Sequence, residues 1–215
     1  MTYTYTPLED FVRDLYHKLN MFVPTDIDMV YIAEQFKVKL HFYDDGSTAV
    51  ENGEELHMFI DERLTPQEQW QDFAHELCHL IRHNGNQLWL STKLSTDYIK
   101  LQESQAENFM YHFCVPSFML LDYQVIDFHT LNEGVPFVSN VFNVTDEFAK
   151  KRLIMFLNQI QQAQLDELHR KQMEALYPKA PPYSAETNQI LAKLYHQLAN
   201  KHKEAPVYAP AKTIS

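Results

Sequence analysis

The spacing of hydrophobic residues predicts two helices at the start of the chain. Between Pro7 and Leu19 these residues recur every three or four positions, which places them on one face of a helix. Proline suits a first helical turn, so this helix is expected to begin at Pro7. The same spacing predicts a second helix from Thr25 or Asp26 to Phe36, with an oxygen-bearing cap at its start.

Beyond this point the period changes from helical to alternating. Hydrophobic and polar side chains alternate over residues 38–43, which predicts a half-buried strand followed by a turn at residues 44–47. Residues 48–50 are expected to form a return strand and residues 56–60 a third strand, with Asn52-Gly53 as a hairpin turn. Together these segments predict a small antiparallel sheet.

Two longer helices are expected after the sheet. Residues 65–68, Thr-Pro-Gln-Glu, are typical of a helix start, with the threonine as cap and the glutamate in a capping box. The helical spacing then continues with no glycine or proline until Gly85. A loop leads to the next helix over residues 96–115, which Pro116 stops.

The C-terminal third is also predicted to be helical. Residues 135–145 indicate a short helix, a turn and a threonine cap, and the apolar stripe of a longer helix follows over residues 148–160. Residues 178–183 are expected to form a proline-rich linker and residues 184–203 a final helix. Residues 204–215 contain two prolines and are expected to be disordered.

Composition limits the class of protein. The chain has 215 residues, of which 45% are hydrophobic, so it can bury a sizeable core. Its formal net charge of −11 argues against a broad electrostatic grip on nucleic acid. Neither a signal peptide nor a run of roughly 20 apolar residues is present, so a cytoplasmic protein without membrane attachment is expected. Cys78 and Cys114 are expected to be buried free thiols.

Residues 75–79, His-Glu-Leu-Cys-His, carry the clearest chemistry. His75 and His79 are one helical turn apart and share a face, so both imidazoles can reach one Zn²⁺ at about 2.0–2.1 Å. Glu76 lies roughly 100° around the helix, beside the metal, and is free to act as a base toward a water whose pKa the metal lowers to about 7. The motif therefore predicts metal-assisted amide hydrolysis, and the alternatives are a solvated His/Glu face of a helix and an inactive remnant of such a site.

A catalytic zinc usually has three protein ligands and a water, so one ligand is still needed. Glu103 and Glu107 are the leading candidates, because they lie on one face of the helix predicted over residues 96–115, with the small Ala106 beside them. Glu103 is the first choice and Glu107 the alternative.

Two stretches resemble the signatures of the ImmA/IrrE zinc metallopeptidases. In that family, His-Glu-x-x-His follows an alanine and precedes a leucine-rich turn with a histidine, as in residues 74–83. The second signature, roughly Glu-x-x-Ala-Asn-x-Phe-Ala with a later proline, is similar to residues 103–110 with Pro116. The departures are Cys78 for the common Gly, Glu107 for Asn and Met110 for Ala. The first Glu of the second signature is a metal ligand in the family, which implies that role for Glu103.

The resemblance implies more than the residues alone indicate. Members of the family are cytoplasmic regulatory proteases, often encoded by prophages and integrative elements, that cleave a helix-turn-helix repressor and release its operon. It thus implies a zinc endopeptidase and anti-repressor with such a repressor as its protein partner, and leaves the oligomeric state open. Two other hypotheses remain: a non-catalytic regulator on a degenerate peptidase fold, and a DNA-binding regulator that uses residues 135–155.

These observations predict a mostly helical α+β protein in which a small antiparallel sheet packs against the His-Glu-x-x-His helix and a Glu-bearing helix. A zincin-like peptidase domain is expected over residues 1–130. A helical extension, which could resemble a helix-turn-helix, is expected over residues 131–177. The linker, the final helix and the tail then follow.

Overall fold

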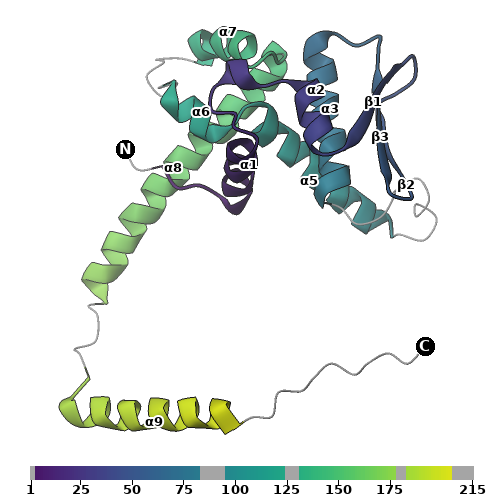
Figure 1. Ribbon diagram of the computed structural model, residues 1–215. Coiled ribbons are helices and arrows are strands. Elements are labelled where there is room, and N and C mark those ends of the chain that lie inside the picture. Colours follow the sequence, from purple (N-terminus) through teal and green to yellow (C-terminus); the bar gives the residue numbers. More distant parts are fainter. Residues whose placement is uncertain (1–2, 83–94, 124–130, 178–182, 205–215) are drawn as a thin grey trace, which may run out of the picture. The chain divides into compact units, whose positions relative to one another are not determined.

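The structure of the chain is a computed structural model that describes residues 3–82, 95–123, 131–177 and 183–204 (Figure 1). The chain divides into two compact units, Met1–Asp166 and Glu167–Ser215. The first unit extends past residue 130, where the sequence placed the end of the peptidase domain. Its hydrophobic core draws on the two N-terminal α-helices, the sheet and the helices described between residues 66 and 160.

The N-terminal region forms α1 (Pro7–Lys18), the short 3-10 helix η1 (Pro24–Asp26) and α2 (Met29–Gln35). The first helix is as predicted, but the single helix expected from Thr25 or Asp26 to Phe36 is wrong. The Asp26 carboxylate accepts the backbone N–H groups of Phe22 and Val23, at 2.9 and 3.1 Å, and so closes a separate turn. Two residues later Asp28 caps α2 instead.

Three strands form one sheet: β1 (Val38–Tyr43), β2 (Thr48–Asn52) and β3 (Glu55–Asp61). The strand order is β1-β3-β2, so β3 lies between the other two. The hairpin between β2 and β3 is antiparallel as predicted, and its Gly53 has the positive φ that such a turn requires. However, β1 runs parallel to β3, so the sheet is mixed.

The expectation of an all-antiparallel sheet was wrong because alternation determines which face of a strand is buried, but not which neighbour it pairs with. The register Leu40↔Met58 and Ala49↔Met58 brings side chains of all three strands to one face. The predicted fold class, a mostly helical α+β protein with a small sheet, is confirmed.

One helix packs on this sheet, α3 (Pro66–Arg82), and a second helix, α5 (Thr96–Cys114), packs on α3 (Figure 1). Both start close to where the sequence placed them. Thr65 and Glu68 form the predicted capping box, since each side chain accepts the other's backbone N–H, at 3.4 and 2.9 Å. The helix α3 contacts β2, β3 and α5, so it is held on two sides.

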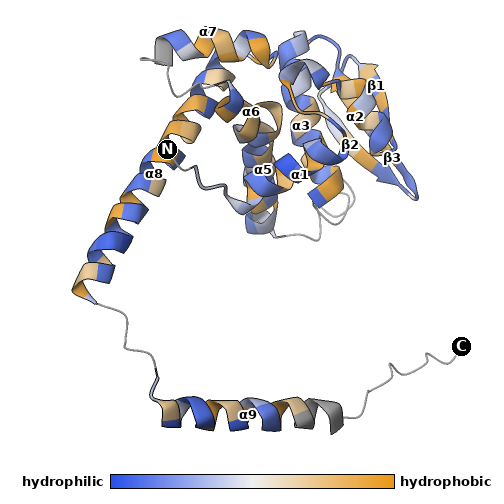
Figure 2. Ribbon diagram, turned by 60° about the vertical axis from the view of Figure 1, so that its left-hand side comes forward, coloured by the Kyte–Doolittle hydropathy of each residue, from blue (hydrophilic) through white to orange (hydrophobic). Residues whose placement is uncertain are grey.

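The remaining helices of the first unit are α6 (Ser117–Asp122), α7 (Leu131–Val141) and the start of α8 (Asp146–Leu176). The predicted threonine cap is present, since Thr145 Oγ1 accepts the backbone N–H of Phe148 at 3.3 Å. The apolar stripe at the start of α8 enters the core, and further along the helix hydrophilic residues dominate (Figure 2).

A buried polar network joins α1, α5, α6 and α8. Arg152 is fully buried and donates to the Val115 carbonyl at 3.0 Å and to Ser117 Oγ at 2.6 Å. Ser117 donates in turn to the carboxylate of Glu9, which is 4% exposed and also accepts from the Tyr3 hydroxyl. His112 Nδ1 lies 3.8 Å from the same carboxylate. The network places two opposite charges inside the core.

The second unit contains the end of α8 and α9 (Ala185–Glu204). The predicted C-terminal helix is thus present, with apolar side chains that are exposed: Ile190, Leu194, Tyr195 and Leu198. The expected linker between the two helices and the expected tail fall almost entirely outside the described residues. Among the helices of the described part, none is both long enough and apolar enough to cross a membrane.

Candidate metal centre

His75 and His79 lie on the same face of α3, one turn apart. Their Nε2 atoms are 3.2 Å from each other, and the ring centroids are 5.0 Å apart. The neighbouring α3 residues Ala74, Leu77 and Cys78 are fully buried, which fixes the rotation of the helix. The two imidazoles are therefore held together at the edge of the core, His75 at 25% and His79 at 13% side-chain exposure.

Glu103 reaches these rings from α5. Its two carboxylate oxygens lie 3.2 Å from His75 Nε2 and 3.6 Å from His79 Nε2. Close packing of α3 and α5 makes this possible, since the small side chain of Ala106 is fully buried in the same core. One donor atom from each of His75, His79 and Glu103 lies within 4.8 Å of the others.

The alternative ligand, Glu107, is directed elsewhere. Its Oε1 accepts from Lys151 Nζ at 2.7 Å, and both side chains are about half exposed. Lys151 also lies over the ring of Tyr111, 4.6 Å from its centroid. Glu107 thus ties α5 to α8 and is not part of the cluster with the two histidines.

The separations within the cluster fit a tetrahedral metal. Zn–N bonds of about 2.0–2.1 Å place two ligand atoms of a tetrahedral site roughly 3.3–3.4 Å apart. The two imidazole nitrogens are 3.2 Å apart, and the shortest distances from them to Glu103, each to a different carboxylate oxygen, are 3.2 and 3.6 Å, all close to this value. Two imidazoles and one carboxylate are also a donor set that catalytic zinc sites use. The residues present are therefore suited to hold Zn²⁺.

Glu76 lies next to this cluster with a strongly perturbed carboxylate. Burial raises the pKa of Glu76 to about 8, and the nearby charges of Asp72 and Glu103 add to the effect. A hydrogen bond from the backbone N–H of Ala49 acts in the opposite direction. A carboxyl group whose pKa lies near neutrality can both accept and donate a proton in that pH range.

The contact between Ala49 and Glu76 could not be found from the sequence. Ala49 lies on β2, the strand at one edge of the sheet, and its side chain carries no chemistry. Its contribution is a backbone N–H, which any residue except proline provides, so no residue pattern signals it. Only the packing of β2 on α3 brings this donor to the site.

Residues 150–152, Lys-Lys-Arg, form a basic cluster within the stretch that the DNA-binding hypothesis uses, but the three side chains are not all available on the surface. Arg152 is fully buried and Lys151 pairs with Glu107. Phe148 and Leu153 beside them are in the core. This region packs as an ordinary helix of the first unit.

Comparisons with known proteins identify the family of the chain. The family model "Peptidase_M78: IrrE N-terminal-like domain" matches residues 32–154, which include α3 and α5. The phage-like element PBSX protein XkdA of Bacillus subtilis (strain 168) is 42% identical over 149 residues, or 69% of this chain and 72% of that protein. The uncharacterized protein YqaB of the same strain is 35% identical over 164 residues, or 75% of this chain and 91% of that protein.

Among solved structures, a Mycobacterium tuberculosis transcriptional regulator aligns with a TM-score of 0.47 at 16% identity. The alignment covers 66% of this chain and 44% of that one.

Proposed function

Because the chain belongs to the family of IrrE N-terminal-like domains, a peptidase-type family, we propose that it is a zinc-dependent endopeptidase. The observation that carries this proposal is the convergence of His75, His79 and Glu103 from two helices, with Glu76 beside them. The ImmA/IrrE resemblance of the sequence, which the family match confirms, supports the same assignment.

In this proposal His75, His79 and Glu103 hold the zinc. Zinc in such a site supplies a Lewis acid, which lowers the pKa of water and polarises a carbonyl group. The helices bring both imidazole Nε2 atoms within 3.2 Å of each other, and each of them lies within 3.6 Å of a Glu103 carboxylate oxygen, so the donor groups already converge. The site is also partly open, since Glu103 is 45% exposed on its side chain. A substrate backbone can therefore approach from that side.

Glu76 is the proton-transfer group. As a carboxylate it accepts the proton of the attacking water, and as a carboxylic acid it donates that proton to the leaving amine nitrogen. Its raised pKa makes proton donation to the amine easier. The hydrogen bond from the Ala49 N–H stabilises the carboxylate form, which is needed to accept the proton of the water. Because Ala49 belongs to an edge strand, the same strand can also position an extended peptide beside the site.

We propose a helix-turn-helix repressor as the substrate. The support is the sequence resemblance to anti-repressor proteases, together with a relative that belongs to a phage-like element. In this role the protein would cleave the repressor and release its operon.

The test is cleavage of a repressor encoded beside the gene, followed by mass spectrometry. The wild-type chain should cut at a defined bond, and a chelator should stop the reaction. Glu76→Gln should keep zinc and slow cleavage by a factor of about 10² to 10⁴, the usual contribution of a proton-transfer group. Glu34→Gln, which alters an exposed carboxylate on α2, is the matched control and should retain cleavage.

Other outcomes would decide against this mechanism or for one of the rival functions. Cleavage that proceeds equally well in Glu76→Gln would remove the mechanism. Partner binding with no zinc and no cleavage would identify a non-catalytic regulator instead. Sequence-selective DNA binding through residues 135–155 would support the third hypothesis, although burial of Arg152 counts against it.

A further inference from the structure

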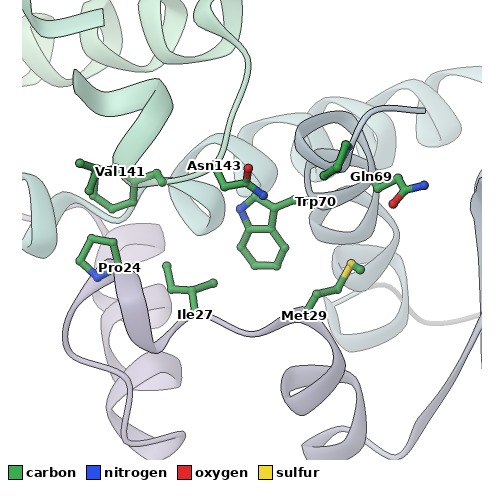
Figure 3. A pocket seen from close by; sticks show the side chains of 9 residues that line it. Pro24, Ile27, Met29, Gln69, Trp70, Val141 and Asn143 are labelled. Atoms are coloured by element: carbon green, nitrogen blue, oxygen red, sulfur yellow. The ribbon is translucent and has the colours of Figure 1, made fainter. Parts of the chain in front are cut away.

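A cavity separate from the metal centre lies where three segments of the first unit meet. Its volume is about 200 Å³. The segments are the η1–α2 region, the first turns of α3, and the end of α7 with the turn that follows it (Figure 3). The residues that line it are Pro24, Ile27, Met29, Pro66, Gln69, Trp70, Val141, Phe142 and Asn143.

The lining is neutral and largely apolar. Within the described residues it includes no charged side chain, and its polar side chains are Gln69, Trp70 and Asn143. Gln69 is already engaged, because its amide donates to the Asp61 carbonyl at 3.2 Å. Trp70 and Asn143 therefore supply the polar groups that a bound molecule would meet.

Trp70 contributes a donor without an acceptor. The residue is 5% exposed, and its indole Nε1 has no hydrogen-bond partner in the described part of the chain. A buried N–H group in that state is unfavourable, and such groups in proteins usually have a partner or a ligand. The indole cannot easily turn away, since it packs against the rings of Phe73 and Phe113, with centroids 5.7 and 5.6 Å away.

Asn143 lies at the rim of the same cavity. Its backbone has a φ of 52°, the left-handed conformation typical of a residue that ends a helix. The backbone N–H of Val144 donates to the Ser139 carbonyl at 3.0 Å, which holds this turn in place. In Figure 3 the nitrogen-bearing side of the indole points toward the Asn143 side chain, while the six-membered ring points toward Ile27 and Met29. The polar groups thus gather at one end of the cavity and the apolar ones at the other.

We propose that this cavity is a ligand site for a small neutral group with an apolar body and one carbonyl oxygen. The carbonyl accepts the Trp70 indole N–H, with the Asn143 amide beside it, and the apolar body lies among Ile27, Met29 and Val141. A cavity of about 150 Å³ can hold benzene, so the present one accommodates a ring with a small substituent. The group can come from a free molecule or from an apolar residue of another protein together with its backbone carbonyl.

This site is distinct from the metal centre. Trp70 precedes His75 by five positions on α3, which corresponds to about 7.5 Å along the helix and roughly 140° around it. The two sites therefore occupy different faces of one helix, and binding in the cavity does not require zinc.

The test uses the full chain with three probes: benzamide, isopropylbenzene and N-acetyl-leucinamide. Benzamide and isopropylbenzene have similar shapes, but only benzamide has a carbonyl. The readout is the indole N–H resonance of Trp70 in a Trp89→Phe background, where Trp70 is the remaining tryptophan. Benzamide should shift this resonance and bind about tenfold more tightly than isopropylbenzene. Tighter binding of N-acetyl-leucinamide than of benzamide would indicate a protein residue as the natural occupant, and the reverse a free molecule.

Two variants isolate the indole. Trp70→Phe should abolish the tenfold preference for benzamide, measured by calorimetric titration, while Tyr31→Ala, on α2 outside the lining, should leave it unchanged. If Trp70→Phe fails to fold, the resonance of the unaltered indole still decides the question. An indole resonance that does not move at saturating benzamide, or equal binding of benzamide and isopropylbenzene, would overturn the proposal.

Discussion

His75 and Glu103 are 28 positions apart in the chain, yet His75 Nε2 lies 3.2 Å from Glu103 Oε2. This proximity follows from the packing of α3 against α5. Both helices are anchored on the core by fully buried residues, Leu77 on one and Phe109 on the other. The proposed metal site is therefore built on rigid elements, which is the arrangement that keeps donor atoms in place.

The hydrogen bond from Ala49 to Glu76 gives a prediction about catalysis. Ala49→Pro removes the N–H that lowers the pKa of Glu76, so this pKa should rise and the carboxylate form should become scarcer at neutral pH. We expect cleavage at pH 7 to slow roughly fivefold, as the loss of one hydrogen bond worth about 1 kcal/mol implies, with unchanged zinc content. Ala49→Ser keeps the N–H and is the control. Equal rates for Ala49→Pro and Ala49→Ser would show that the bond has no role.

The buried Arg152 gives a prediction about stability. Arg152→Met has a similar shape but leaves the Glu9 carboxylate inside the core with no opposite charge near it. Removing one partner of a buried charge pair typically costs about 3–5 kcal/mol, and we expect the free energy of unfolding in urea to fall by that amount. The double variant Glu9→Gln/Arg152→Met should be more stable than Arg152→Met alone. A double variant that is equally unstable would show that the two charges do not compensate one another.

His112 predicts a pH dependence of stability. Burial and the charge of Arg152 lower the pKa of His112 to about 3, and together they outweigh the charge of Glu9, which raises this pKa. An unfolded histidine has a pKa of about 6.5, so below that pH the unfolded chain binds a proton that the folded chain does not. His112 should therefore cost no stability above pH 6.5 and progressively more as the pH falls toward 3, reaching about 2 kcal/mol at pH 5.

The variant His112→Leu tests this dependence. Its free energy of unfolding should fall less than that of the wild type between pH 7.5 and pH 5, by about 2 kcal/mol. Titration of Glu76 changes the stability in the opposite direction, because its raised pKa favours the folded state at acid pH. Glu76 is present in both the wild type and the variant, so its effect cancels when their free energies of unfolding are subtracted. If the free energies of unfolding of the wild type and of His112→Leu change by the same amount between pH 7.5 and pH 5, the assignment of His112 as a neutral core residue is contradicted.

Residue patterns predicted the elements that hold the site better than they predicted its surroundings. The boundaries of α1, β1 and α3 follow from hydrophobic spacing and capping residues, which act locally. The histidine pair also follows from local spacing, because positions four apart on a helix share a face. The sequence named Glu103 as the first choice for the third ligand and Glu107 as the alternative. What separates the two in the structure is Lys151, which lies 44 positions after Glu107 and engages it.

The misses share one physical cause. The split between η1 and α2 depends on the Asp26 side chain, which accepts the backbone N–H groups of two preceding residues. Such a side-chain hydrogen bond competes with helix formation, and hydrophobic spacing does not reveal it. The parallel pairing of β1 depends on which strand lies in the middle of the sheet. The Ala49 contact depends on the backbone of an edge strand. Each feature is decided by tertiary contacts or by backbone groups that the identity of the residue does not reveal.

The central claim is that His75, His79 and Glu103 bind one zinc ion, and metal content of purified variants tests it most directly. The pair Glu103→Ala and Glu107→Ala is matched, because each removes one half-exposed carboxylate from α5, one turn apart. Elemental analysis should find close to one zinc per chain in the wild type and in Glu107→Ala. Glu103→Ala should lose at least about 100-fold in zinc affinity, more than the change of an outer-shell residue produces. A wild type without zinc, or a Glu103→Ala chain that retains as much zinc as Glu107→Ala, would contradict the account.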